Sequence, residues 1–537
     1  MRKVARQRLT GYDAPDLTLT IAPRAPVELS LVRALALPLA FATGLAALAL
    51  HESVAQNPTL RWSILGAAAV LAAWSVALFV LRQRSGQALR IEVVFRTQHY
   101  LQACAQGSVL LYWGWYWREV YDSAHLIFAQ LLFAYAFDML LGWSRRDTYT
   151  LGFGIFPVIF SINLFLWFKP EWFYLQFVMV ALGFAAKELI RWDKDGRQTH
   201  IFNPSSFPLA VFSLALLLTG ASDRTWGLDI ATTQFFPPHI YAMLFLIGLP
   251  GQFFFGVTTM TMSAVVATYM FGLVYYALTG VYFFYDSYIP IAVFLGMHLL
   301  FTDPSTSPRT ELGRIIFGVL YGLSTVALYA ALTRLGLPTF YDKLLQVPVL
   351  NLSIKLIDRA ARSRWLRPLD PAALGQWLAP RQRHLAYMAV WTIVFAGMSA
   401  AGGVGDDHPG QWLPFWQKAC GDGAPRACAY LDGVEASRCN RGSGWACNEV
   451  GIRQARREED YTGAIDWIAR GCDLGFAAAC DNRREAHGVG SALKSAPPTL
   501  DDLPIVLRGS KGPITDRSPA ELWALACREG WPGTCQM

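Results

Sequence analysis

The chain has 537 residues, of which 54% are hydrophobic and 16% are charged, and its formal net charge at pH 7 is +7. Soluble domains average roughly 45–50% apolar and about 25% charged residues, so this composition excludes an ordinary soluble protein and indicates burial in a bilayer. The positive charge does not indicate nucleic-acid binding, because Arg and Lys cluster in short segments between apolar stretches, where they set membrane topology.

The chain begins with a basic arm, residues 1–33, and the first apolar run starts near Leu35. This start is too late for a compact cleavable signal peptide, so we expect the first span to remain as an anchor. Windows of roughly 17–25 apolar residues, the length that crosses about 30 Å of hydrocarbon, then recur as far as Ala401. We therefore expect an all-α fold with a polytopic transmembrane bundle of about 11–13 spans. Twelve spans are expected at residues 34–50, 63–81, 99–117, 124–142, 150–168, 172–190, 205–220, 238–256, 262–280, 285–302, 315–333 and 385–401.

The loops of the expected core, residues 34–334, alternate in charge. Those at 82–96, 143–147 and 187–200 are rich in Arg and Lys, whereas the loops between them are poorer in both. Basic loops stay in the cytoplasm, so we expect the N-terminus inside a bacterial inner membrane and the loop 221–237 outside.

A basic connecting segment, residues 335–384, joins the core to the last span at 385–402 and also looks cytoplasmic. Twelve crossings would return the C-terminus to the cytoplasm, so one further crossing is needed if the C-terminal region lies outside. The run 341–357, interrupted by Pro348, is the candidate for a broken or re-entrant helix inside the bundle, where irregular backbone is tolerated. An interfacial amphipathic helix explains the same run, and the sequence leaves both interpretations open.

Beyond residue 402 the composition changes to Gly, Asp, Arg, Ala and Cys, which predicts a separate domain at 403–537. Eight of the nine cysteines lie there, in four pairs that all read C-x-x-G-x-x-x-x-C. In our interpretation the first Cys ends a helix, the Gly supplies a left-handed residue and the second Cys begins the next helix, so that a disulfide staples the pair. The expected disulfides join Cys420 to Cys428, Cys439 to Cys447, Cys472 to Cys480 and Cys527 to Cys535, with Gly423, Gly442, Gly475 and Gly530 between them.

A zinc site is the alternative for these thiols, but zinc sites favour two to four residues between cysteines, so we expect disulfides and no metal. Disulfides persist in oxidising compartments, which predicts a periplasmic domain. Cys104, alone in an apolar span, is expected to be an ordinary small core residue.

The spacing of the pairs and the helical residues around them, such as AIDWIARGCDLGFAAAC at 464–480, resemble Sel-one-like repeats of the cysteine-rich bacterial type. The resemblance covers residues 412–485 and, as a last turn, 518–537. It implies a solenoid of helix pairs that binds other membrane or periplasmic protein subunits.

Three polar motifs interrupt the apolar spans, and polar groups in such places are costly unless they are paired or used. They read FNPSSF at 202–207, PGQFFFGVTTMTMSA at 250–264 and TDPSTSPRTELGRIIFG at 302–318. Asn203 and Asp303 are also ordinary helix-capping residues, which explains part of the pattern without any ligand.

Together the motifs resemble the NqrB/RnfD family, the membrane subunits of sodium-pumping NADH:quinone oxidoreductase and of the Rnf complex, over residues 95–335. The resemblance implies an electron-transfer subunit that carries flavin mononucleotide (FMN), or another flavin, bound through its phosphate to a threonine. It also implies the cofactor-binding residues, which are Asn203, Pro204, Thr258, Thr259, Asp303, Arg309 and the threonine pair Thr232 and Thr233.

One departure concerns that threonine pair. The family's attachment signal has Ser-Gly before Ala-Thr, whereas this chain reads Asp-Ile-Ala-Thr-Thr at 229–233. A glycine there allows close backbone approach, so its absence favours a flavin held without a covalent bond over attachment at Thr232 or Thr233. A non-redox transport component and a membrane-anchored scaffold remain the alternative functions.

Aromatic clusters at 112–117 and 282–285 fit interfacial belts better than flavin-stacking surfaces. His239, His298 and Asp286, at the ends of expected spans, are candidates for moving protons or binding a cation. The sequence identifies no catalytic residue.

Overall fold

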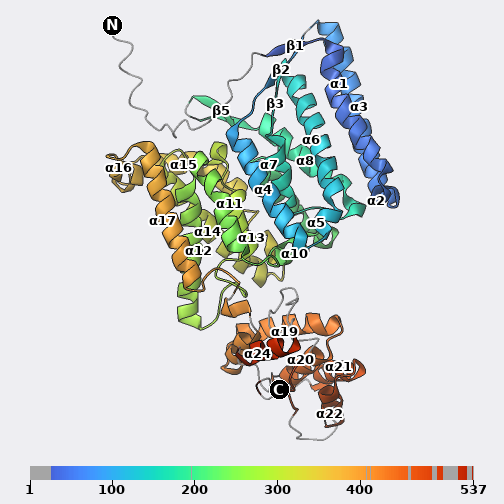
Figure 1. The fold of residues 1–537 in the computed structure, drawn as a ribbon, viewed down its shortest axis with the longest axis vertical. Helices are drawn as coiled ribbons and strands as arrows, with labels where there is room; N and C mark the ends of the chain where they lie inside the picture. Colours follow the sequence, from blue (N-terminus) through green and yellow to red (C-terminus); the bar gives the residue numbers. More distant parts are fainter. Residues whose placement is uncertain are drawn as a thin grey trace. The chain divides into compact units, whose positions relative to one another are not determined.

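The computed structural model describes residues 26–86, 88–194, 196–406, 408–411, 413–457, 461–485, 493–499, 518–528 and 535. These residues are mostly helical, as expected, with a few short strands that the sequence did not predict (Figure 1). They form two compact units. The bundle unit comprises the chain up to Thr268 and Ile291–Met398, and the tail unit comprises Tyr269–Pro290 and Ser399–Met537.

Five helices within the described residues are long and apolar enough to cross a membrane, and each lies where a span was expected. They are α1 with its 3-10 extension η1 (Leu31–Leu50), α3 (Pro58–Ser85), α6 (Ala124–Arg145), α12 (Thr258–Thr279) and α14 (Glu311–Arg334). Helices also form at five further expected spans, and these are α4 (Thr97–Tyr116), α8 (Tyr174–Leu189), α9 (Ser206–Thr219), α11 (Ile240–Phe255) and α17 (Pro380–Ala400).

Two expected spans are wrong as continuous helices. The span predicted at 150–168 contains only α7 (Ile155–Asn163), and the one at 285–302 contains only α13 (Ile291–Leu299). Nine residues of α-helix rise about 14 Å, half of what a bilayer core requires. Both short helices are followed by buried irregular backbone, at 164–168 and 300–302. Composition missed these breaks because the irregular residues are as apolar as the helices.

The strands gather at one end of the bundle unit, which we call the sheet end. β2 (Leu89–Val93) lies between β1 (Val27–Leu29), with which it is antiparallel, and β3 (Thr148–Leu151), with which it is parallel. A hairpin of β4 (Arg191–Lys194) and β5 (Arg197–His200) follows α8. The opposite end, which we call the α10 end, carries the short helix α10 (Gly227–Thr233) and the 3-10 turns η2 (Pro170–Trp172), η3 (Ser222–Arg224) and η5 (Thr339–Tyr341).

Helix α15 (Val347–Ala361) forms over most of the run 341–357, for which the sequence allowed either a broken helix inside the bundle or an interfacial helix. Just before it, Tyr341 bonds to Ser222 at the α10 end, and near its end Asp358 bonds to the backbone of Arg309 at the sheet end. The helix packs against α14 and α9 along the way. The chain therefore passes back through the bundle, and Pro348 lies in the first turn of the helix, where proline is tolerated, and does not break it.

Helices α12 and α14 approach each other through glycine. A Cβ added at Gly318 would overlap the carbonyl oxygen of Met260, and one at Gly322 would lie 2.6 Å from that of Ala264. Small residues spaced four apart allow two helix backbones to meet, a device common between apolar helices.

We expect Gly318→Ala to lower the free energy of unfolding by about 1–3 kcal/mol, because a backbone carbonyl has no rotamer by which to give way. Gly66→Ala, at a position in α3 with no atom within 4 Å of the added carbon, is the matched control and should be neutral or stabilising. Thermal unfolding of both purified variants measures the difference. Equal melting temperatures would contradict this account of the packing.

The tail unit consists of helix pairs. The helices of its described residues after residue 412 are α18 (Leu413–Gly421), α19 (Pro425–Asn440), α20 (Gly444–Arg457), α21 (Tyr461–Asp473), α22 (Ala477–Glu485) and α24 (Pro519–Arg528).

All four expected disulfides are present in the tail unit, and their pairing is the predicted one. The bonds join Cys420 to Cys428, Cys439 to Cys447, Cys472 to Cys480 and Cys527 to Cys535. The glycines between the first three pairs, Gly423, Gly442 and Gly475, have φ of 90°, 104° and 85°, the left-handed conformation that the pattern predicted. Gly530 and the arm 1–25 lie outside the described residues.

The position of the second cysteine of each pair is also as expected where the structure describes the helix that follows. Cys428, Cys447 and Cys480 lie in the first turns of α19, α20 and α22, so each bond holds the end of one helix to the start of the next. Cys535 follows α24, and the residues between them lie outside the described ones.

Two predictions about individual side chains are wrong. Cys104 is exposed on α4 and is not a core residue. Tyr282, Phe283 and Phe284 are buried and do not form an exposed belt. Tyr282 packs against Phe415 and Trp416, with ring centroids 4.7 and 6.3 Å apart, so the loop that contains it forms one core with the first tail helices.

Candidate functional site

Two of the three predicted motifs meet at the sheet end of the bundle unit. We call this group the motif cluster, which comprises Lys194, His200, Asn203, Asp303, Arg309, Thr310, Asn351 and Asp358. Its residues come from β4, β5, the start of α9, the segment after α13, and α15. Side chains from distant parts of the sequence therefore lie together, although most of their bonds are to backbone.

Asn203 holds the start of α9 to the break after α13. Its Oδ1 accepts hydrogen bonds from the backbone N–H groups of Ser205 (3.0 Å) and Ser206 (3.1 Å), while its Nδ2 donates to the carbonyl of Leu300 (3.0 Å). This satisfies a carbonyl that α13 leaves unpaired where it stops. The next residue, Pro204, packs closely against Gly183. A Cβ added at Gly183 would overlap the carbonyl oxygen of Pro204.

Asp303 caps the turn η4 (Pro304–Thr306) through the N–H of Ser305 (3.0 Å) and lies 3.2 Å from His200 Nε2. Burial alone would raise the pKa of Asp303, but the hydrogen bond and charge of His200, with Ser305 and Thr306, hold it below its ordinary value. The ionised carboxylate thus fixes the segment after the break of α13.

Lys194 and Asp358 tie down the next residues. Lys194 Nζ donates to the carbonyl of Ser307 at 2.5 Å, and burial lowers its pKa to about 8, with Arg309 adding to the effect. Asp358 accepts from the backbone N–H of Arg309 (3.0 Å) and from both the N–H (3.1 Å) and the hydroxyl (3.0 Å) of Thr310. The side-chain Nε of Arg309 is buried and has no hydrogen-bond partner among the described residues.

The second motif lies beside the start of α14. Thr259 donates to Glu311 Oε2 at 2.8 Å, and Arg314 bonds to Glu311 Oε1 at 2.6 Å. Gly256 has φ of 63°, and a Cβ there would lie 3.0 Å from His384. The hydroxyl of Thr258 is buried and has no hydrogen-bond partner among the described residues.

Thr232 and Thr233 lie elsewhere, on α10. Helix α9, about 21 Å long by its 14 residues, separates α10 from the motif cluster. Thr233 is buried, and its hydroxyl bonds to the indole N–H of Trp113 (3.1 Å) and to the carbonyl of Asp229 (2.6 Å). Thr232 is exposed, and its hydroxyl contacts only its own helix, at the carbonyls of Leu228 and Asp229.

A cluster of four tryptophans adjoins Thr233. Trp113, Trp117, Trp167 and Trp226 pack with ring centroids 5.0–6.2 Å apart. The sequence indicated only an aromatic run at 112–117, because Trp167 and Trp226 come from distant segments.

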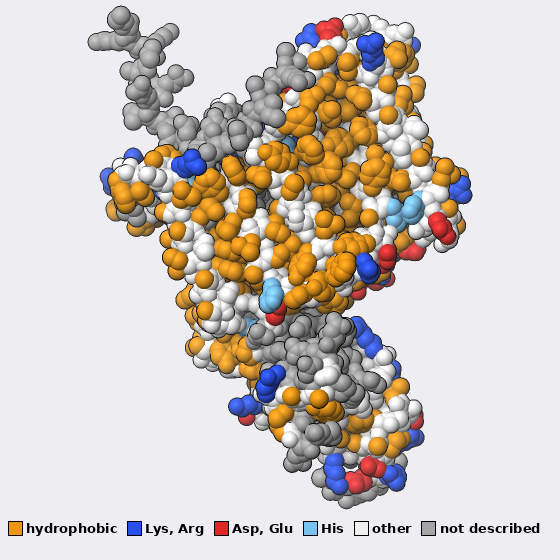
Figure 2. Space-filling view, in the orientation of Figure 1, with side chains coloured by type: hydrophobic (Ala, Val, Ile, Leu, Met, Phe, Trp, Pro, Cys, Tyr) orange, Lys and Arg blue, Asp and Glu red, His pale blue; other side chains and the backbone are white. Residues whose placement is uncertain are grey.

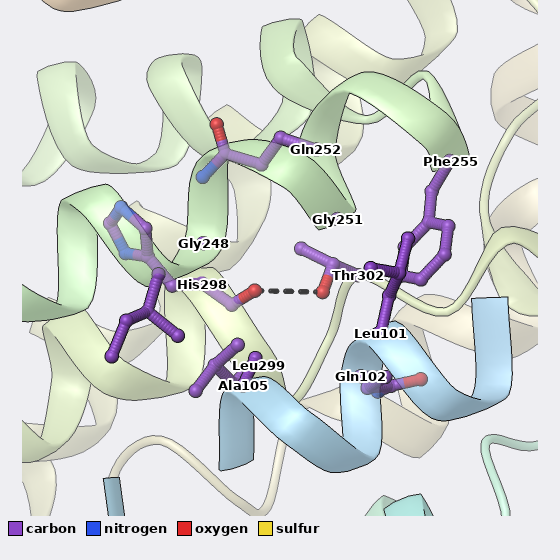
Figure 3. A pocket seen from close by; sticks show the side chains of 11 residues that line it. Leu101, Gln102, Ala105, Gly248, Gly251, Gln252, Phe255, His298, Leu299 and Thr302 are labelled. Carbon is purple, nitrogen blue, oxygen red and sulfur yellow. Dashed lines mark hydrogen bonds between the residues drawn. The ribbon is translucent and has the colours of Figure 1, made fainter. Parts of the chain in front are cut away.

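Small cavities lie beside both broken helices. One, of about 10 Å³ and so with room for about one water molecule, is lined by α4, α11 and the end of α13 (Figure 3). His298 Nδ1 donates to the carbonyl of Phe294 (2.8 Å), which leaves Nε2 without a partner among the described residues. Gln252 is 1% exposed, and both polar atoms of its side chain also have none there.

The cavity beside α7 adjoins an amide network. Gln130 Nε2 donates to Asn163 Oδ1 (3.0 Å), and Gln176 Nε2 donates to Gln130 Oε1 (2.9 Å). Gln176 also accepts from the N–H of Phe168 (3.1 Å), the last residue of the irregular segment. These residues were not predicted from the sequence, in which an amide side chain within an apolar helix is the one feature that indicates them.

The histidines and the aspartate expected at span ends lie in different settings. His298 is buried inside the bundle unit, His239 is exposed at the start of α11, and Asp286 belongs to the tail unit. A buried ion pair lies at the α10 end, where Lys343 Nζ is 3.5 Å from Asp342 Oδ1. The sequence did not predict this pair.

The eight predicted flavin residues therefore do not fit one flavin site. Six lie toward the sheet end, and the threonine pair lies at the α10 end. Of the six, Asn203 and Asp303 bond to backbone and Thr259 bonds to Glu311. Thr258 Oγ1 and Arg309 Nε are buried without a hydrogen-bond partner among the described residues. Of the eight, Thr232 is the exposed one, and covalent attachment of a flavin requires a hydroxyl that is accessible.

Comparisons of the chain with protein-family models, with curated proteins and with solved structures find no match. The resemblances to the NqrB/RnfD family and to Sel-one-like repeats thus stay predictions.

We expect Asp358→Asn to lower the free energy of unfolding by roughly 1.5–3 kcal/mol, because the carboxylate accepts charge-assisted bonds from two backbone N–H groups and one hydroxyl. Arg359→Ala, at the exposed neighbouring position, should change it by less than about 0.5 kcal/mol. Thermal unfolding of both variants tests the difference, and an unchanged midpoint for Asp358→Asn would remove the structural role given to this residue.

Proposed function

We propose that the chain is a multi-pass protein of a bacterial inner membrane. The visible face of the bundle unit is largely hydrophobic (Figure 2). Exposed apolar side chains of this unit include Leu50, Trp62, Leu218 and Ile393, each at least 72% exposed. Apolar side chains at such exposure are unfavourable in water and favourable against lipid. The short helices α7 and α13 fit this setting because broken helices are tolerated where protein covers them.

In this proposal the sheet end faces the cytoplasm. Loops and helix ends there are rich in Lys and Arg, as cytoplasmic loops are. These basic residues include Arg82, Arg84, Arg90, Arg96, Arg145, Arg146, Lys187, Arg191, Arg359, Arg364, Arg367, Arg381 and Arg383. With α15 as an additional crossing, the tail follows an odd number of crossings and lies in the periplasm, where its disulfides persist.

This topology predicts the redox state of the cysteines. In protein purified without reductant, iodoacetamide should modify Cys104 alone, because the other eight cysteines are paired. After denaturation and reduction, intact mass should increase by eight further adducts. Free tail thiols in the unreduced sample would contradict the periplasmic location.

We further propose that the protein is a membrane subunit of an electron-transfer complex of the NqrB/RnfD type. The observation that carries the proposal is the surface of α10, where exposed Thr232 adjoins a threonine in contact with the four-tryptophan cluster. A flavin at this surface, held without a covalent bond or linked through its phosphate to Thr232, would supply one- and two-electron transfer. Indole rings are favourable partners for its ring system. Buried Thr233 would serve as the link between α10 and Trp113.

A flavin on Thr232 predicts yellow fluorescence that survives denaturation and migrates with the protein in a gel, when the chain is produced together with a flavin transferase. Thr232→Ala should abolish this fluorescence. Thr233→Ala is the matched control and should retain it, because the Thr233 hydroxyl is buried and already bonded. Fluorescence lost in Thr233→Ala and kept in Thr232→Ala would contradict the assignment.

A second candidate function is movement of a proton or small cation through the bundle. It is favoured by the two broken helices and by His298 and Gln252 beside one of them, which carry polar atoms without partners among the described residues, since discontinuous helices form binding sites in carriers. A colourless protein whose tail is fully oxidised would favour this function over electron transfer.

A further inference from the structure

An extended segment of the tail unit, residues 493–499, lies against the helix pairs. Its sequence is LKSAPPT. The N–H of Lys494 donates to Asn482 Oδ1 at 2.9 Å, and Asn482 Nδ2 donates to the carbonyl of Lys494 at 2.8 Å. One amide side chain on α22 thus holds both polar backbone groups of a single residue, as a neighbouring β-strand would.

Helix α20 holds the next two residues. Trp445 Nε1 donates to the carbonyl of Ala496 at 3.1 Å, and Glu449 Oε2 accepts from the hydroxyl of Ser495 at 2.8 Å. Glu449 also interacts with the backbone N–H of Ala496. The backbone contacts fall on Lys494 and Ala496, two residues apart, which is the repeat of an extended chain.

The helix residues that hold the segment are fixed by one another. Asn482, Trp445 and Glu449 are 1%, 1% and 7% exposed. Asn482 Nδ2 also donates to Asn448 Oδ1 (2.8 Å), and Asn448 Nδ2 reaches Glu449 Oε1 (3.3 Å). We call Trp445, Asn448, Glu449 and Asn482 the groove residues. Preorganised polar groups of this kind bind without the entropy cost of ordering them.

Beyond these bonds, Lys494 Nζ lies 4.0 Å from Glu485 Oε1, an ion pair between exposed side chains. Lys494, Ser495, Pro497 and Thr499 are exposed, and Pro498 is its one buried residue. Each hydrogen bond contributes only about 1 kcal/mol net, so an equivalent chain could replace it. The groove residues bond to backbone groups and to one small hydroxyl of the segment. These contacts therefore select a class of ligand and not one sequence.

We propose that the groove residues form a binding site for an extended, proline-containing segment of a partner protein, and that residues 493–499 are an internal occupant that the partner displaces. The ligand has free N–H groups at the positions of Lys494 and Ala496, a hydroxyl side chain between them and proline directly after. This inference deepens the proposed recruitment of a partner by the tail and is independent of electron transfer.

Proline substitutions in the segment test the proposal without altering the helices. Lys494→Pro together with Ala496→Pro removes the two N–H donors and keeps the chain extended. We call this double substitution the released variant. Lys494→Ala keeps both donors and is the matched control. The probe is a labelled, end-capped peptide of sequence LKSAPPT, titrated by fluorescence anisotropy against the full-length protein in detergent.

The released variant should bind the peptide at least tenfold more tightly than the wild type and Lys494→Ala. A tethered occupant acts at an effective concentration of about millimolar and reduces the fraction of open grooves. Adding Asn482→Ala to the released variant should weaken binding at least tenfold. A peptide with proline at both substituted positions should not bind.

Absence of peptide binding to a released variant with all tail cysteines oxidised would overturn the proposal. Equal binding to the wild type and the released variant, or binding that survives Asn482→Ala, would do so too. Loss of the tail disulfides in the released variant would show that the segment is part of the domain and not a displaceable occupant. The flavin readout of Thr232→Ala is separate, so failure of one proposal leaves the other intact.

Discussion

The bundle unit depends on how it satisfies backbone groups where helices stop inside an apolar interior. An unpaired buried carbonyl or N–H costs about 1–3 kcal/mol. At α13 the amides of Gln106 and Asn203 donate to the carbonyls of Leu299 and Leu300. At α7 the amide of Gln234 donates to the carbonyl of Leu164 (2.6 Å). Side-chain amides thus replace the missing turns.

This constraint explains why residues that resemble a cofactor motif are largely structural here. Asn203, Asp303 and Asp358 direct most of their bonds to main-chain atoms and so fix the shape of the two breaks. The cavities beside the breaks are small but contain polar groups without partners among the described residues, notably His298 and Gln252. A position that moves charge through the bundle is best sought there, and an attachment point for a cofactor at α10.

The tail unit uses a different means of stabilisation. Each short disulfide loop stabilises by about 2–3 kcal/mol, because it restricts the unfolded chain. The bridges hold neighbouring helices together where few large side chains are available, and an aromatic core around Trp416 ties the loop 269–290 to them. Between its helix pairs, Trp445, Glu449 and Asn482 are buried with residues 493–499 in place, and each is hydrogen-bonded to that segment.

Periodicity and spacing in the sequence determined the helical class, five long apolar helices and all four disulfides. These features are local, since an apolar run or a Cys-Gly-Cys spacing such as that from Cys420 to Cys428 acts over a short stretch of chain. The breaks in α7 and α13, the separation of Thr232 from the motif cluster, and the groove around residues 493–499 were decided by tertiary structure alone. The reason is that each depends on hydrogen bonds between segments far apart in the chain, such as that from Gln106 to Leu299.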